Sequence, residues 1–246
     1  MPDVTDPGSP GVHQIWFSDG PDPETLPANS RALRSMVGPE RFHLWTIGRT
    51  RQLIVDNFAA EVTRAFDRLR PYAYKADLAR YCIVMHHGGY YLDLAVSGVV
   101  LTETRDWDFI GFRDLNSDAT SWKVANNYFF ARQGSILMAD CLEQILENCS
   151  REYYGKDPHF PTGPSVLGRA VAKLGPDLRI LVGEYMWFAH RRNKYLMPHK
   201  RIVGRGKVGG RANGGVSNVP GGNNYNDLWH ARTVYGPEGD ALPGRG

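Results

Sequence analysis

One segment constrains this chain more than any other: a helical pattern that ends at two glycines and is followed by a short apolar run holding a carboxylate. The pattern spans residues 75–87, where the apolar residues are followed by the stop Gly88-Gly89. Residues 90–96 then have the composition of a buried strand, which places Asp93 at or near its carboxyl end. In open α/β sheets ligands bind at that edge, so Asp93 is the first candidate site residue.

The rest of the chain continues the alternation of strands and helices. Further strands are expected at 12–17, 42–47, 107–112 and 127–131, and further helices at 30–37, 58–69, 136–146 and 164–174. Alternating elements indicate an α/β fold, and the adjacent strands after residue 96 indicate that the sheet is not purely parallel. We therefore predict one domain with a mixed, mainly parallel central sheet flanked by helices.

Composition and charge exclude several classes of protein. The 246 residues are 42 % hydrophobic and carry a net charge of only +3, which suits a globular chain and gives no argument for nucleic acid as a partner. No apolar run approaches the roughly 20 residues of a membrane span, and the first residues lack the pattern of a secretory signal. Three cysteines suit a reducing compartment. We expect a cytoplasmic protein without an integral membrane segment.

The distribution of charge is uneven. Residues 185–226 hold eight cations and no acid, so the remainder carries −5. Within this segment, residues 204–222 contain eight glycines, too many for a packed element, and we expect a mobile basic loop there. It would close over an anionic group, with Lys207 or Arg211 as anchors. The alternative is a plain surface linker with solvated charges.

Three charged residues carry the chemistry. Asp77 and Arg80 are three apart and share one face of the predicted helix, and Asp93 follows on the strand. Together they can hold a ribose-diphosphate, with carboxylates on hydroxyls or a divalent ion and a guanidinium on an anion. Asp77 and Arg80 could instead form an ordinary exposed ion pair. A zinc site at Cys82 and His86 is disfavoured because no second pair has matching spacing.

The motifs around these residues resemble those of a known family. The helix reads KADLARY, the following segment HHGGYYLDL and the first strand VHQIWF, with weaker matches in NNYFFA, TGPSVL and LWHA. In order and spacing they resemble the DXD-containing sugar-transferase family with the GT-A fold, which includes capsule and mannan glycosyltransferases and the glucosylating domains of clostridial cytotoxins. The resemblance implies a domain over 12–235, between a flexible N-terminus (1–11) and a flexible tail (236–246).

The resemblance also implies roles for individual residues. Trp16 would lie beside the nucleotide base, Asp77 and Arg80 would contact the donor sugar, and Asp93 would be the first carboxylate of the Asp-X-Asp site and the catalytic residue. Two further positions follow from the weaker motifs: Asn127 would bring an amide to the donor sugar, and Gly163-Pro164 would lie beside the acceptor cleft.

For several of these motifs, a purely structural role is the alternative to a role in binding. Trp16 is by default a core aromatic, Asn126 and Asn127 are turn formers, and Thr162 to Pro164 begin a helix. In the LWHA motif, Trp229 would be a core aromatic and His230 a solvated side chain.

The chain departs from the family at the second carboxylate, where it has Ala95. In GT-A enzymes that acid is usually the direct metal ligand. A divalent cation, Mn²⁺ or Mg²⁺, would therefore be held by Asp93 with help from His230 or Asp227 near the C-terminus. Weak metal binding is expected with one carboxylate fewer.

Two functions remain open. The first is a retaining glycosyltransferase that moves a hexose from a nucleoside diphosphate sugar to a hydroxyl of a saccharide, small molecule or protein. The second is a non-catalytic protein that binds sugar nucleotides or a partner on a decayed transferase scaffold, as Ala95 suggests. A nicotinamide enzyme is disfavoured because no Gly-x-Gly-x-x-Gly turn follows the first strand.

Overall fold

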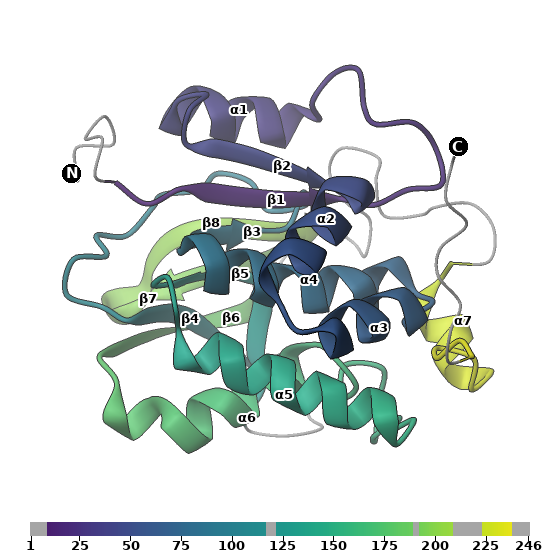
Figure 1. Cartoon of the computed structure of the whole chain (residues 1–246). Helices are drawn as coiled ribbons and strands as arrows, with labels where there is room; N and C mark the ends of the chain where they lie inside the picture. Colours follow the sequence, from purple (N-terminus) through teal and green to yellow (C-terminus); the bar gives the residue numbers. More distant parts are fainter. Residues whose placement is uncertain (1–8, 117–121, 189–191, 209–222, 238–246) are drawn as a thin grey trace.

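The computed structural model describes residues 9–116, 122–188, 192–208 and 223–237, and one mixed sheet runs through this part of the chain (Figure 1). Its eight strands lie in the order β2-β1-β3-β5-β4-β6-β7-β8. The strands are β1 (Val12–Trp16), β2 (Phe42–Thr46), β3 (Gly89–Leu92), β4 (Phe109–Asp114), β5 (Val124–Ala131), β6 (Ile180–Phe188), β7 (Arg192–Met197) and β8 (Arg201–Val208). The helices are α1 (Ala28–Val37), α2 (Ile47–Asn57), α3 (Ala60–Arg68), α4 (Tyr72–His87), α5 (Ile136–Ser150), α6 (Pro164–Leu174) and α7 (Tyr225–His230), with 3₁₀ turns at Gly175–Asp177 and Pro198–Lys200.

The α/β class and the mixed sheet are confirmed, but parallel pairs do not dominate the sheet as expected. The pairs β1–β2, β1–β3 and β4–β6 are parallel, whereas β3–β5, β4–β5, β6–β7 and β7–β8 are antiparallel. Only a few residues connect β6 to β7 and β7 to β8, and so short a connection can join only antiparallel strands. The sheet is therefore parallel in its first part and mostly antiparallel in its second.

These directions gather several strand ends at one edge of the sheet. Strands β1, β2, β3, β4 and β6 run the same way and β5 runs against them. The ends of β1, β3 and β4 therefore meet the start of β5, at Trp16, Leu92, Asp114 and Val124. We call this the carboxyl edge.

The sheet separates two apolar cores. Successive side chains of a strand point to opposite faces, so Tyr91 and Phe129 join the core under helices α2 to α6, while Tyr90 and Tyr128 join the core on the other face. On the helical side α4 and α6 contact the strands, and α5 packs against both of these helices (Figure 1). Helix α4 is thus enclosed, and residues 77–84 are all buried.

The glycines after α4 are required by backbone geometry. Gly88 has φ +67° and Gly89 φ +104°, conformations that L side chains rarely adopt. A Cβ on Gly89 would also collide with the carbonyl oxygen of Gly11. The two residues end α4 and bring β3 alongside β1, as the sequence predicts.

Element boundaries differ from expectation at two places that matter for the site. Strand β3 ends at Leu92, so Asp93 follows the strand and residues 93–96 leave the sheet. Residues 204–208 belong to β8 although a Gly-rich loop was predicted from 204, because Gly204 lies between the rings of Tyr195 and Tyr128, where its missing side chain leaves room. The rest of that loop, with Arg211, lies outside the described residues, as do 1–8 and 238–246.

None of the helices in the described ranges has the length and hydropathy needed to cross a membrane.

Candidate functional site

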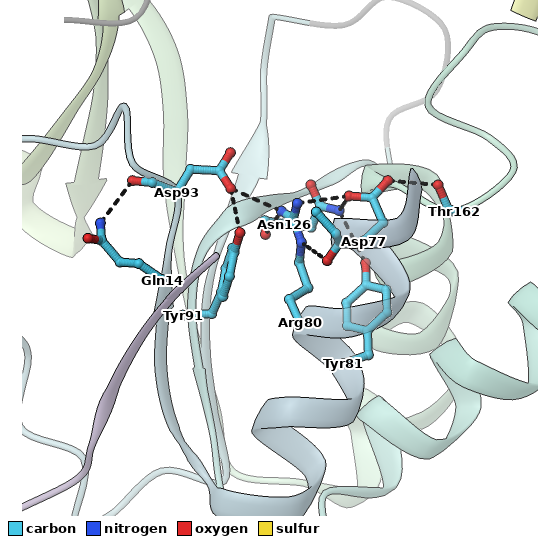
Figure 2. A network of polar contacts seen from close by, with 9 residues as sticks. Gln14, Asp77, Arg80, Tyr81, Tyr91, Asp93, Asn126 and Thr162 are labelled. Atoms are coloured by element: carbon cyan, nitrogen blue, oxygen red, sulfur yellow. Dashed lines mark hydrogen bonds and ion pairs between the residues drawn. The ribbon is translucent and has the colours of Figure 1, made fainter. Parts of the chain in front are cut away.

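The site begins at Asp77, whose carboxylate is buried in α4 close to the carboxyl edge (Figure 2). Its Oδ1 accepts a hydrogen bond from Asn126 Nδ2 at 2.8 Å and lies 3.1 Å from a terminal nitrogen of Arg80. Its Oδ2 accepts from the hydroxyl of Thr162 at 2.7 Å. Three separate parts of the chain therefore converge on one carboxylate, and the alternative of an exposed helix ion pair is wrong.

Arg80 connects Asp77 to Asp93. Its Nε donates to the carbonyl of Ala76, one turn back on α4, and Nη1 donates to the carbonyl of Asn126 at 2.6 Å. The same Nη1 lies 3.5 Å from Asp93 Oδ1, and the guanidinium lies over the ring of Tyr91, 4.5 Å from its centre. Because the side chain is only 6 % exposed, Arg80 acts chiefly by holding the carboxylates in place.

Asp93 is the most accessible member of this network. It follows directly on β3, and its side chain is 33 % exposed. Oδ1 accepts from the hydroxyl of Tyr91 at 2.7 Å, while Oδ2 has no partner among the described residues. The backbone is fixed on both sides, since Asp93 N donates to the carbonyl of Asn127 and Gln14 Nε2 donates to the carbonyl of Asp93. A fixed carboxylate with a free oxygen is suited to binding ligand hydroxyls.

Burial and hydrogen bonding act in opposite directions on the network's charges. Burial raises the pKa of Asp77, whereas Arg80, Thr162 and Asn126 favour its ionised form. Burial also raises the pKa of Tyr91, which keeps its hydroxyl protonated as a donor to Asp93. Two carboxylates thus share one guanidinium.

Two buried amide oxygens next to Asp93 have no partner in the described part of the chain. They are Oε1 of Gln14 and Oδ1 of Asn127, and both residues bond to the backbone of Asp93 through their other groups. Buried polar atoms are rarely left without a hydrogen bond, so each such atom calls for an explanation. Bound water or a ligand at the carboxyl edge would provide the missing hydrogen bonds. Asn127 lies within β5 and not in a turn, so it remains a candidate donor-binding residue.

Trp16 ends β1 at the carboxyl edge and is half-buried. Its Nε1 donates to the hydroxyl of Ser18 at 3.2 Å, and the residue is absent from both apolar cores. The alternative of an ordinary core aromatic is therefore disfavoured.

The Gly163-Pro164 turn lies against Asp77. A Cβ on Gly163 would come within 3.3 Å of Asp77 Oδ2, and Pro164 occupies the first turn of α6. The turn therefore begins α6, as the structural alternative predicts, and it also lies directly beside Asp77.

The predicted metal ligands do not come together. Asp227 and His230 are exposed on α7, and the described residues contain no group of three or more His, Cys, Asp or Glu side chains that could hold a metal ion. Ala95 is buried and offers no ligand, and Asp93 is already bonded to Arg80 and Tyr91. The residues that the structure describes therefore do not fit a divalent cation. Cys82 is a fully buried thiol whose pKa burial raises, which also leaves the zinc alternative without support.

Sequence reasoning missed five residues of the network in Figure 2: Gln14, Tyr81, Tyr91, Asn126 and Thr162, where the hydroxyl of Tyr81 accepts from Asn126 Nδ2 at 3.4 Å. Two of them carried a signal. Asn126 and Asn127 form an amide pair in an otherwise apolar strand, and Thr162 opens the TGPSVL motif. Lys207 and Arg211, the proposed anchors of the basic loop, have no described side chain, so their role stays a prediction.

Comparison with known proteins bears on the same segment. Residues 24–127 match the model of the family described as "Glycosyltransferase sugar-binding region containing DXD motif". The chain is 35 % identical over 145 residues to the "Uncharacterized glycosyltransferase L373" of Acanthamoeba polyphaga mimivirus, a match that covers 56 % of this chain and 53 % of the relative. The chain thus spans about half the length of the relative it matches. Among solved structures, "PaToxG Glycosyltransferase" aligns with a TM-score of 0.43 at 14 % identity, covering 68 % of this chain and 70 % of that one.

The matched segment holds Asp77, Arg80 and Asp93, and with them the motifs KADLARY and HHGGYYLDL. The resemblance seen in the sequence is therefore confirmed over residues 24–127, which are similar to the sugar-binding region of the DXD-containing glycosyltransferases.

Proposed function

We propose that the protein transfers a sugar, a hexose, from a nucleoside diphosphate sugar to a hydroxyl acceptor. One observation carries this proposal: Asp93, in the segment related to sugar transferases, is held at the carboxyl edge by Arg80 and Tyr91 with one oxygen free. Its surroundings suit a sugar, because carboxylate and amide oxygens are natural acceptors for sugar hydroxyls.

The chain's residues would divide the work of binding the donor. The free oxygen of Asp93 accepts from donor hydroxyls, and the amide oxygens of Gln14 and Asn127 accept further hydroxyls or an exocyclic N–H. Trp16 lies beside the base. Arg80 does not need to touch the donor, since its contacts hold Asp77 and Asp93 in register.

The reaction breaks the bond between the anomeric carbon and the diphosphate oxygen, and a bond forms from the acceptor oxygen to that carbon. With retention, the departing phosphate oxygen takes the proton of the acceptor hydroxyl, so no strong protein base is needed. The barrier lies in an oxocarbenium-like state, in which fixed dipoles and charges lower the energy of the separating charges. The divalent cation that the resemblance implies has no ligand set among the described residues.

A second candidate function follows from Ala95. A chain that has lost the second acid of the motif could still bind a sugar nucleotide without turnover. The preserved Asp77–Arg80–Asp93 network favours the enzyme, because a lone buried ion network costs desolvation and has no evident benefit for stability alone.

A donor panel tests the proposal. Purified protein is incubated with UDP-, GDP-, ADP- and dTDP-hexoses, with and without Mn²⁺, and release of nucleoside diphosphate is followed beside binding by thermal shift. We expect turnover of at least one donor and its loss in Asp93→Asn. Binding without release from every donor and acceptor favours the second function, and absence of both contradicts the proposal.

A further inference from the structure

A second polar cluster lies beside the donor network and is not used by the function proposed above. Lys123, just before β5, is only 1 % exposed, and its Nζ donates to Asp157 Oδ2 at 2.7 Å. The same Nζ lies 3.4 Å from Nδ1 of His159, and that nitrogen is also 3.4 Å from Asp157 Oδ1. We call these three residues the Lys-Asp-His cluster. A buried lysine is rare and is kept only with a partner, so the cluster is a built feature.

The cluster adjoins the donor network through a short loop. Thr162 donates to Asp77, and the next residue, Gly163, donates its backbone N–H to the carbonyl of His159 at 3.2 Å. A Cβ on Gly163 would stand 3.2 Å from that carbonyl and 3.3 Å from Asp77 Oδ2. One glycine thus lies between the two groups, and they adjoin each other near the carboxyl edge.

His159 is the member of the cluster that can reach a ligand. Its side chain is 44 % exposed, while Asp157 is 24 % exposed and Lys123 is enclosed. Nδ1 faces the Lys123–Asp157 pair, whereas Nε2 has no partner among the described residues. The half-buried ring of Tyr225 from α7 lies 6.3 Å from the imidazole, centre to centre, and could pack against the apolar face of a sugar ring.

The charges around His159 favour an uncharged ligand. Lys123 and Asp157 neutralise each other, and the carboxyls of Asp77 on α4 and Asp114 on β4 face the same region. Burial, followed by the Lys123 charge, lowers the pKa of His159, so its ring is neutral at pH 7. A neutral imidazole presents either a donor or an acceptor at Nε2, and a hydroxyl can bond to both forms. Among the described groups that act on His159, an anionic ligand would meet the carboxylates of Asp77 and Asp114, while the cation of Lys123 is already paired with Asp157.

We propose that His159 and Asp157, with Lys123 as the positioning residue, bind the hydroxyls of a neutral saccharide, and that this saccharide is the acceptor. Lys123 holds the carboxylate, Asp157 and His159 offer the hydrogen bonds, and Tyr225 offers an apolar surface. The assignment as acceptor rests on the proposed function, because only a transferase has an acceptor. The saccharide site itself does not depend on turnover.

Direct binding tests the site. Saturation-transfer NMR is recorded with methyl α-glucoside, methyl α-mannoside, methyl β-galactoside and lactose, and with glucuronic acid and a Ser/Thr-rich peptide as competing classes. The protein is used as wild type and as the variants His159→Ala, His159→Gln and His86→Ala. His86, near the carboxyl-terminal end of α4, is the control histidine outside the proposed site. Thermal melting checks that each variant is folded. In parallel, acceptor-dependent transfer and donor hydrolysis to water are measured with the donors that the panel identifies.

We expect the wild type to bind at least one neutral saccharide. His159→Ala should bind it about tenfold more weakly, as for the loss of one hydrogen bond. His159→Gln should restore part of this affinity, and His86→Ala should bind like the wild type. With an active donor, the acceptor KM rises about tenfold in His159→Ala while donor hydrolysis is unchanged. Three results overturn the proposal: no saccharide binding by the wild type, equal binding by wild type and His159→Ala, or preference for the peptide or glucuronic acid. A parallel loss of donor hydrolysis in His159→Ala would move the residue to the donor side. Failure of the donor panel with intact saccharide binding contradicts only the transferase.

Discussion

Helix α4 and strands β1 and β3 carry a polar cluster at each end. In the cluster around His13, which we call the closed end, the protein itself satisfies the hydrogen bonds of the buried ring, whereas the network around Asp93, which we call the open end, keeps atoms without a partner among the described residues. At the amino-terminal end of the strands, His13 accepts a hydrogen bond at Nδ1 from Trp45 Nε1 (3.2 Å), and its Nε2 donates to the carbonyl of Gly88 (2.9 Å). His43 and His87 stack on its ring, with centres 5.1 and 5.7 Å away. Both nitrogens of the buried ring are thus bonded by the protein itself.

At the carboxyl edge the same elements leave groups unpaired. Within the described ranges, Oε1 of Gln14, the neighbour of His13 on β1, has no hydrogen-bond partner, and neither has Oδ2 of Asp93 after β3. The closed end therefore needs no ligand and serves stability, whereas the open end keeps bonding capacity for a ligand. The comparison teaches that polarity and burial alone do not mark a binding site, and that accessible or unmet hydrogen-bonding capacity next to a fixed carboxylate is the feature that sets the carboxyl edge apart.

The strongest test breaks the open end alone. Asp93→Ala removes the accessible carboxylate, and we expect transfer to fall by on the order of 100-fold or more, as for loss of a group aimed at the reacting centre. Donor binding should fall as well, while the melting temperature stays near that of the wild type, because Arg80 keeps its bonds to Asp77 and Asn126. Nucleoside diphosphate release and thermal melting measure the two effects. Turnover at the wild-type rate in a folded variant would remove Asp93 from the site.

Arg80→Ala tests the link that holds the open end together. It leaves the buried Asp77 without its cation, which costs about 3–5 kcal/mol of unfolding free energy, and donor affinity should fall because Asp93 loses its support. Arg49→Ala is the matched arginine at the closed end, where Arg49 lies exposed over Trp45, and it should cost less than about 1 kcal/mol. Urea unfolding of both variants gives the comparison, and equal losses would contradict it.

Titration of His13 at the closed end should make the free energy of unfolding depend on pH. Burial lowers the pKa of His13 to about 3 in the folded protein, from 6.5 as its ordinary value. Between these two values the unfolded chain binds a proton that the folded chain does not. Stability is therefore fully present above pH 6.5 and falls as the pH drops toward about 3, by up to about 1.4 kcal/mol per pH unit.

Urea unfolding between pH 4 and 8 measures this slope in the wild type and in His13→Gln. The variant should show a slope smaller by about one proton, which separates His13 from other titrating groups. Donor turnover per folded molecule should be unchanged, since His13 lies away from the carboxyl edge. An unaltered slope would show that His13 is not the group responsible.

The smallest expected effect is a change in metal affinity at the open end. Ala95→Asp restores the second acid of the motif, and we expect Mn²⁺ affinity to rise by about tenfold, because added ligand charge tightens such sites. In the wild type, activity should persist under chelation, because the described residues form no group that could hold a metal ion. Metal titration of activity and of intrinsic tryptophan fluorescence gives the measurement. Tight stoichiometric metal in the wild type, unchanged by the substitution, would mean that the motif is aligned wrongly.

Local patterns explain what could be predicted. The helices later seen as α1, α3, α4, α5 and α6 were expected from periodicity, and the glycine stop located β3 and Asp93. Helix α2 was missed because it begins directly after β2, with no turn residue between them and with a polar stretch, IGRTRQ. Strands β6 to β8 were missed. The sequences of β7 and β8 are cationic, and β8 also contains glycines, so these strands are stabilised by tertiary pairing: β6 pairs with β4, β7 with β6 and β8 with β7.

By itself the sequence determined the α/β class, the α4–β3 unit with Asp93 at its end, and the relation to sugar transferases, because each depends on residues close together in the chain. The tertiary structure alone decided the rest. It brought Thr162 and Asn126 onto Asp77, enclosed Lys123 against Asp157, and left Asp227 and His230 out of any metal cluster in the described residues. Contacts between residues 34 to 85 positions apart carry no local periodicity, and whether a polar atom finds a partner is settled only when the distant segments pack.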